Sequence, residues 1–278
     1  EFAQQSFSPD VNWAISNMQE EFDTKIKSQF SPNSAIYQKW FNFIAHMKLE
    51  FRNIEGRKFS NLIWIKKGAN KNKTLVLSAN YDSIIQDKKT RSIRHGQEAL
   101  GANDNASSVI ILLKLVEYLS KIELPFNVWV VFFDLQEYGN LGAKAFVQEY
   151  FSEIKSDEEI FQINSLMLSK VNLSKNSKEF YLNGPLESMF SGRLLDSAKS
   201  LVPEVKLRKI RSHYPSSDSG PFVDAGVASL TIRGLNEQEE ARFTHQVMDS
   251  PESIDEYGLS LGGKFLFSLV LSSLYPIP

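Results

Sequence analysis

Three residues in separate segments of the chain, Asp104, Glu137 and His245, have side chains that could together hold a zinc ion. Each lies in a short polar segment of the kind that follows a strand. Two carboxylates and one imidazole are ligands that zinc accepts at about 2.0–2.2 Å, and three protein ligands leave a fourth position open. A zinc ion in such a site lowers the pKa of its water to roughly 7 and polarises a carbonyl group. The three residues therefore predict one zinc site with an open coordination position.

The elements that must position these residues alternate between strands and helices. Strands are predicted at residues 61–65, 74–78, 127–133, 165–171, 205–210 and 228–232, and helices at 106–122, 141–150, 186–201 and 254–275. This alternation favours one mostly parallel sheet covered on both faces. Sites in such sheets lie beyond the carboxyl ends of the strands. The residues predicted to fall there are Asn80, Asp82, Asp104, Glu137 and Ser169.

Residues 1–50 are predicted to form a helical segment that packs on the main domain, which would comprise residues 51–278. Apolar residues recur at helical spacing from Trp13 to Phe22 and from Ile36 to Met47. A break between the two helices is expected at residues 31–34, where serine, proline and asparagine cluster. The aromatic residues interpreted as core, rather than as ligand-stacking groups, are Trp13, Trp40, Phe43, Trp64 and Trp129.

Composition excludes several classes of partner and site. With 31 basic and 33 acidic residues among 278, and a net charge of −2, the chain has no broad basic face, so nucleic acid is not an expected partner. The absence of cysteine excludes disulfides and thiolate metal sites. No membrane span is expected, because Gly262-Gly263-Lys264 interrupts the last apolar stretch. Glu1-Phe2 resembles a remnant in front of a mature N-terminus, so a secreted or periplasmic location is expected.

Five motifs occur in the order and spacing of a known family of zinc enzymes. They are Asn80-Tyr81-Asp82-Ser83, the segment from Gly101 to Ser108, the segment from Phe132 to Gly139 with the helix after it, Ser217-Asp218-Ser219-Gly220-Pro221-Phe222, and His245 with Asp249, Glu252, Ile254 and Asp255. Together they resemble peptidase family M28, the zinc aminopeptidases and their glutaminyl cyclase branch, over roughly residues 62–275. The resemblance implies a single α/β domain with a central mixed, mostly parallel sheet of about eight strands flanked by helices.

The resemblance also implies roles for individual residues. In the family two zinc ions share a bridging aspartate, which matches Asp104, and one of them also takes a glutamate and the last histidine, which match Glu137 and His245. The other zinc takes a first histidine and a later aspartate. Those two positions fall on Asn80 and on Ser169, with Asn164 and Asn172 as alternatives for the second.

The family's general base falls on Gln136, whose amide cannot carry a proton near neutral pH. A positioned general base typically adds about 10²–10⁴-fold to a rate. Asp218 is the best remaining candidate for a residual acid or base, and Asp82 and Asp249 are expected to support the ligands from behind. The glutaminyl cyclase branch keeps both the base glutamate and the later aspartate, and this chain keeps neither. His95 and His213 are candidates for the mouth of the site.

We therefore expect a degenerate family member that keeps one zinc site and lacks the second site and the base. Such a protein would be catalytically impaired or inactive and would bind zinc together with a peptide N-terminus or a protein partner. One alternative is an active single-zinc aminopeptidase or glutaminyl-cyclase-like enzyme, in which Asp218 or a zinc-bound hydroxide replaces the base. Another is a structural domain without metal.

Overall fold

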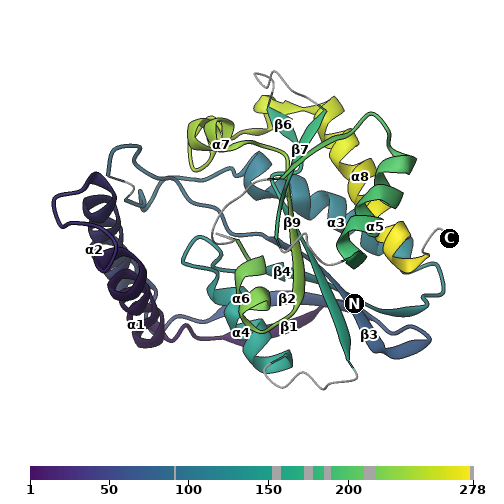
Figure 1. Ribbon diagram of the computed structural model, residues 1–278, viewed down its shortest axis with the longest axis horizontal. Helices are drawn as coiled ribbons and strands as arrows, with labels where there is room; N and C mark the ends of the chain where they lie inside the picture. The colour runs from purple at the N-terminus through teal and green to yellow at the C-terminus, as the bar shows by residue number, and fades with distance from the viewer. Residues whose placement is uncertain (91, 152–157, 172–177, 185–188, 210–216, 276–278) are drawn as a thin grey trace.

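The structure is a computed structural model that describes residues 1–90, 92–151, 158–171, 178–184, 189–209 and 217–275. Its centre is one mixed sheet of eight strands in the order β1-β2-β4-β3-β5-β9-β7-β8 (Figure 1). The strands are β1 (Ala3–Phe7), β2 (Phe59–Lys66), β3 (Asn70–Asn80), β4 (Phe126–Phe133), β5 (Glu159–Leu166), β7 (Glu179–Asn183), β8 (Lys206–Lys209) and β9 (Ala228–Arg233). A separate antiparallel pair joins β6 (Lys170–Val171) to β10 (Ile254–Asp255).

The four central strands β4, β3, β5 and β9 are parallel neighbours, so their carboxyl ends meet at one edge of the sheet. Strands β1 and β2 extend the sheet antiparallel at one side, and β7 pairs antiparallel with β9 at the other. The prediction of a single α/β domain with a mixed sheet of about eight strands is therefore confirmed.

Helices cover both faces of the sheet because the strand side chains alternate between two apolar cores. On one face, Leu75 and Leu77 pack with α3 (Ser107–Leu119), α5 (Met189–Leu201) and α8 (Glu256–Leu274). On the other face, Val76 packs in a core with Phe146 of α4 (Leu141–Tyr150) and Phe222 of α6 (Ser219–Asp224). Phe146 and Phe222 are both completely buried, with ring centroids 5.9 Å apart. These cores hold the strand ends that carry the site.

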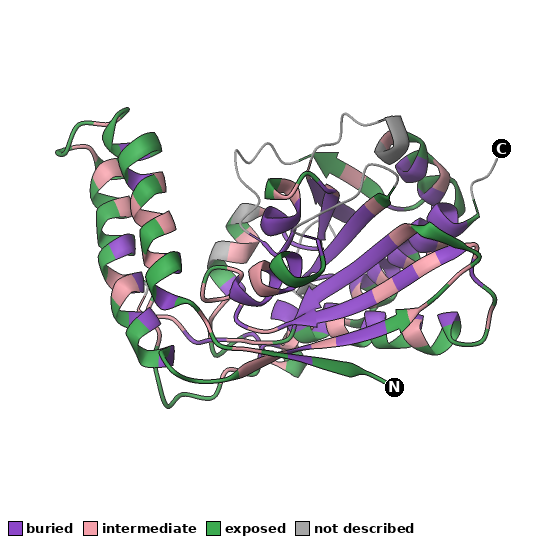
Figure 2. Ribbon diagram, turned by 90° about the horizontal axis from the view of Figure 1, so that it is seen from below, coloured by how far each residue is buried: buried purple, intermediate pink, exposed green. Residues whose placement is uncertain are grey.

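Two antiparallel helices, α1 (Val11–Glu21) and α2 (Ala35–Ile54), stand at one end of the molecule, and most of their surface is exposed (Figure 2). A short π-helix, η1 (Phe22–Lys27), extends α1. The Ser34 hydroxyl accepts the backbone N–H of Tyr37 and caps α2, which explains the break expected there. Val11 of α1 and Phe51 of α2 pack against Leu135 and Leu141 of the main body.

Several elements differ from the sequence predictions. The first residues form β1 at the sheet edge, where no strand was predicted. The strand predicted at 165–171 lies earlier, as β5, and β7 was not predicted. Trp13 and Phe43, interpreted as core residues, are 45% and 43% exposed, because the helical pair leaves one face uncovered. Trp64 is buried as expected. The predicted helix 254–275 is confirmed as α8.

Helix α8 continues through Gly262-Gly263-Lys264, which the sequence prediction took as an interruption. By length and composition alone it could cross a membrane, with a mean hydropathy of 1.3 in its most apolar window. However, 61% of that window is buried within the fold, and α8 packs against α3 and α5. A core helix has this composition, so the apolar character of α8 is explained by its packing.

Candidate metal centre

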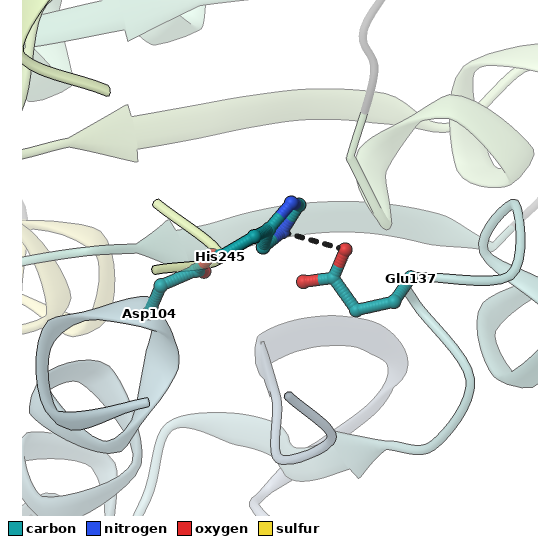
Figure 3. Close-up of side chains that lie close together, drawn as sticks. All are labelled: Asp104, Glu137 and His245. Carbon is teal, nitrogen blue, oxygen red and sulfur yellow. Dashed lines mark ion pairs between the residues drawn. The ribbon is translucent and has the colours of Figure 1, made fainter. Parts of the chain in front are cut away.

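Asp104, Glu137 and His245 meet at the carboxyl edge of the central strands (Figure 3). Asp104 lies in a short π-helical turn, η2 (Ala102–Ala106), directly before α3, and its peptide bond to Asn105 is cis. Glu137 lies in the loop between β4 and α4. His245 follows α7 (Glu237–Phe243), with a φ of 60°. The structure thus brings together the three residues that the sequence proposed as ligands.

The geometry of the three side chains fits a zinc ion. Nε2 of His245 lies 2.8 Å from Oε2 of Glu137 and 3.3 Å from Oδ2 of Asp104. Ligand atoms on a tetrahedron around zinc are roughly 3.3–3.6 Å apart, given bonds of about 2.0–2.2 Å. The three side chains are 5%, 6% and 18% exposed, in the order Asp104, Glu137, His245. Small shifts of these side chains would therefore admit the ion.

The charge balance of the cluster also suits a cation. Burial lowers the pKa of His245, but the Coulombic attraction of Glu137 and the hydrogen bonds to Asp104 and Glu137 outweigh it and raise the pKa to about 11. Burial raises the pKa of Glu137, and the nearby imidazolium opposes that rise. The two buried carboxylates thus favour positive charge beside them, as a bound metal cation would supply.

Gln86 fixes the orientation of the histidine ring. Its Oε1 lies 3.0 Å from Nδ1 of His245, and its backbone N–H donates to the His245 carbonyl at 3.0 Å. An acceptor on Nδ1 leaves Nε2 as the nitrogen available to a metal. Sequence reasoning missed Gln86 because it is 159 residues from His245 in an irregular loop. No motif or periodicity marks it.

Two further aspartates, Asp82 and Asp249, accept backbone N–H groups of the segments that carry the candidate ligands. Asp249 accepts the backbone N–H groups of Asn103 and Asp104, at 2.7 and 3.0 Å. Asp82 accepts those of Gln136 and Glu137, both at 3.1 Å. Burial and the charge of Glu137 raise the pKa of Asp82 to about 8, while these N–H groups oppose the rise.

Asp218 precedes α6 and is completely buried. Neither of its carboxylate oxygens has a hydrogen-bond partner among the described residues. Burial, followed by the charges of Asp82 and Glu137, raises the pKa of Asp218 well above its ordinary value. A raised pKa favours the protonated form of a carboxyl group, which can donate a proton. Its role as a residual acid stays a prediction.

Asn80 stands at the carboxyl end of β3, where the family would have its first histidine. Its side chain is buried and both polar groups are engaged: Oδ1 accepts from Nδ2 of Asn105 at 2.8 Å, and Nδ2 donates to the Asp82 carbonyl at 3.1 Å. Asn105 also donates to the Ser165 carbonyl and accepts the backbone N–H of Met167. This amide network engages both polar groups of the Asn80 side chain in hydrogen bonds within the protein.

The strand register indicates which residue faces Asn80 across the sheet. Ser78 of β3 pairs with Asn164 of β5, so two residues further on Leu166, the last residue of β5, is level with Asn80. Ser169 lies three residues beyond the strand, and its hydroxyl contacts the carbonyl of Asp255 at 3.4 Å, beside the β6–β10 pair. The register therefore favours Leu166 over Ser169 as the position of the family's later aspartate, because β5 begins and ends earlier than the sequence suggested. Leu166 was not considered from the sequence, and the alternative Asn172 lies outside the described residues.

The structure describes two of the remaining predicted site residues, Gln136 and His95, and shows the hydrogen bonds that they form. Gln136 precedes Glu137 in the β4–α4 loop, and its carbonyl accepts the N–H groups of Gly139 and Asn140. His95 does not reach the ligands by a hydrogen bond: its Nε2 lies 2.7 Å from Oε2 of Glu50 on α2. His213 lies outside the described residues.

Comparison with known proteins places this architecture among aminopeptidases. Over 232 residues the chain is 25% identical to aminopeptidase YwaD of Bacillus subtilis (strain 168). The matched region covers 81% of this chain and 47% of that protein. The structure resembles that of BSAP, a zinc aminopeptidase from Bacillus subtilis, with a TM-score of 0.64, 24% identity, and coverage of 79% of this chain and 51% of that one. The chain therefore spans about half the length of these Bacillus relatives.

Two other solved structures share the fold over nearly the whole of this chain. The Legionella pneumophila LapA aminopeptidase has a TM-score of 0.66 at 14% identity and covers 98% of this chain and 72% of its own. A leucine aminopeptidase precursor from Bacteroides thetaiotaomicron has a TM-score of 0.59 at 16% identity and covers 99% and 100%. The sequence model of peptidase family M28 matches residues 61–268, which contain every residue of the candidate metal centre. This chain belongs to peptidase family M28.

Proposed function

We propose that the protein binds a single zinc ion through Asp104, Glu137 and His245, and holds a peptide N-terminus or protein ligand there without appreciable hydrolysis. The observation that carries the proposal is the hydrogen-bonded pair of Asn80 and Asn105 beside Asp104. Both polar groups of Asn80 are used within the protein, and Leu166 is level with it in the sheet. A neutral amide that is already hydrogen-bonded within the protein and an apolar side chain are poor surroundings for a second divalent ion.

The residues around the proposed zinc have two kinds of role: some position the zinc ligands, and others would have to transfer a proton during hydrolysis. Bound zinc would supply a Lewis acid that polarises a carbonyl group of the ligand. Gln86 orients the His245 ring, while Asp82 and Asp249 hold the loops of Glu137 and Asp104. Gln136 can hydrogen-bond a peptide group, but its amide cannot accept a proton from an attacking water. Binding is thus supported, whereas proton transfer is not.

The rival function is an active single-zinc aminopeptidase or cyclase, and Asp218 is the observation in its favour. Asp218 is completely buried, and the charges of Asp82 and Glu137 act on it. A carboxyl group whose pKa is raised is a candidate proton donor that does not depend on Gln136. An active protein should therefore lose its rate in Asp218→Asn, which keeps the shape of the side chain but cannot donate as an acid.

Activity and binding measured on the same zinc-loaded preparation separate the two functions. Against aminoacyl-anilide substrates and peptides with N-terminal glutamine, we expect rates at the background of His245→Ala. Calorimetry should show that peptides with a free N-terminus bind the zinc-loaded protein and that binding weakens in His245→Ala. A zinc-dependent turnover that is lost in both His245→Ala and Asp218→Asn would replace the proposal with the rival enzyme.

A further inference from the structure

A cavity of about 780 Å³ lies between α2 and the loop that joins β3 to α3. Its volume is in the range of roughly 300–1,000 Å³ that ligand pockets occupy. One wall is a stretch of α2 from Lys39 to Met47, and the other is part of the loop from Gln86 to Ile93. Helix α2 stands away from the sheet at this end of the molecule (Figure 1). We call this cavity the α2 groove.

Four apolar side chains contribute to the lining of the α2 groove. Trp40 and Phe43 of α2 lie edge to face with centroids 5.7 Å apart, and Met47 and Ile93 continue the lining. Phe43 is 43% exposed, although the helix that carries it packs its opposite side against the main body. A contiguous apolar surface left open to solvent commonly marks a site of interaction. The aromatic pair therefore offers a surface for an apolar side chain of a ligand.

Among the residues that the structure describes, the charged side chains that line the α2 groove are all basic. Lys39 and Lys89 line it, both are exposed, and neither forms an ion pair with a described residue. No carboxylate of the described residues contributes to the lining. Asp87, the nearest acid along the chain to Lys89, is already paired with Arg94 at 2.6 Å. In a protein of net charge −2, this local excess of positive charge favours an acidic ligand.

Gln86 connects the α2 groove to the metal centre. It lines the groove, and the same side chain contacts Nδ1 of His245. A peptide that reaches His245 with its first residue can thus pass over Gln86 and continue between α2 and the loop. Asp104 and Glu137 do not line the groove, so it would contact only later residues of the ligand.

We propose that the α2 groove binds the segment of a peptide ligand that follows its N-terminus, and that it selects an apolar side chain flanked by acidic residues. This inference rests on the proposed function, because the metal centre is taken to hold the N-terminus of the same ligand. Trp40 and Phe43 receive the apolar side chain, and Lys39 and Lys89 face the acidic ones.

Fluorescence anisotropy with matched peptides tests the selection. Two peptides with free N-termini and a C-terminal label share one phenylalanine and differ only in having glutamates or lysines around it. Zinc-loaded protein should bind the acidic peptide roughly tenfold more tightly, because each of two exposed charge pairs adds a modest attraction. The difference should shrink as salt is raised, because exposed charges are screened.

Reversing the charge of the two groove lysines tests whether they cause the preference for the acidic peptide. The double variant Lys39→Glu/Lys89→Glu should abolish or invert the preference for the acidic peptide. Lys67→Glu/Lys88→Glu is the matched control, because it changes the net charge equally at exposed lysines that do not line the groove. The control should keep the preference, and both double variants should keep the zinc content and thermal stability of the unmodified protein.

Three outcomes would overturn the inference, and they are distinguishable from one another. Zinc-dependent binding with equal affinity for the two peptides would exclude the groove but leave the proposed function intact. Equal loss of preference in the two double variants would show that overall charge, and not the groove, selects the peptide. If neither peptide binds the zinc-loaded protein, both the groove and the proposed peptide-binding function are wrong.

Discussion

Replacing Gln86 with leucine should weaken zinc binding without unfolding the protein. The substitution removes the acceptor for Nδ1 of His245, which lies 3.0 Å away, but keeps the backbone N–H that donates to the His245 carbonyl. Loss of such a partner behind a ligating histidine typically costs 10–100-fold in metal affinity, about 1.4–2.7 kcal/mol. Gln86→Glu keeps an acceptor and should retain most of the affinity.

Competition with a chromophoric chelator at pH 7 measures this difference. Gln246→Leu is the control, because the Gln246 amide donates to the carbonyls of Gln86 and His245 and does not contact the ring. Its zinc affinity should change less than that of Gln86→Leu. If folded Gln86→Leu binds zinc as tightly as the unmodified protein, Gln86 does not orient the ligand. If Gln86→Glu loses as much as Gln86→Leu, the effect of Gln86 does not depend on its acceptor.

Three further predictions concern the metal and the missing base. The double variant Asn80→His/Leu166→Asp should raise the zinc content toward two ions per chain. The variant Asn80→His/Ser169→Asp should not, because Leu166, and not Ser169, is level with Asn80. Elemental analysis measures the zinc content of both variants. Zinc binding at pH 7 should release about one proton from His245, because its raised pKa of about 11 keeps it protonated, so affinity should rise with pH. Calorimetry in buffers of different ionisation enthalpy measures that release, and no release would contradict a protonated ligand. Gln136→Glu alone should leave peptide hydrolysis near background, since one metal is still missing; a 10²-fold gain in an anilide assay would show that only the base was lacking.

The parts of the fold that the sequence predicted are those with a strong local pattern. The apolar run of β4 is visible in the sequence because the strand is buried on both faces. The helical spacing of α3 and α8 is visible because these helices pack against the core. Strand β1 has no such pattern: in AQQSF only Gln5 is buried, and it is held by Asn61. Its place at the sheet edge depends on long-range pairing with β2, which a local pattern does not contain.

The three candidate ligands, which the structure brings together, could be singled out because each lies in a motif that fixes its position in the chain. The boundary of β5 was not, since a continuous apolar and polar mixture from Glu159 to Ser169 gives no signal for where the strand ends. That boundary decides between Leu166 and Ser169. Gln86 and the α2 groove were invisible for a different reason. They arise where two distant segments meet, so they depend on the tertiary structure.

The amount of zinc that each chain holds tests the central claim most directly. Native mass spectrometry of the purified protein, titrated with zinc and compared with His245→Ala, gives this number. The account predicts one tightly held ion per chain, and none in His245→Ala, because two carboxylates alone are a weak zinc site. Two tightly held ions per chain, or one that persists in His245→Ala, would contradict it.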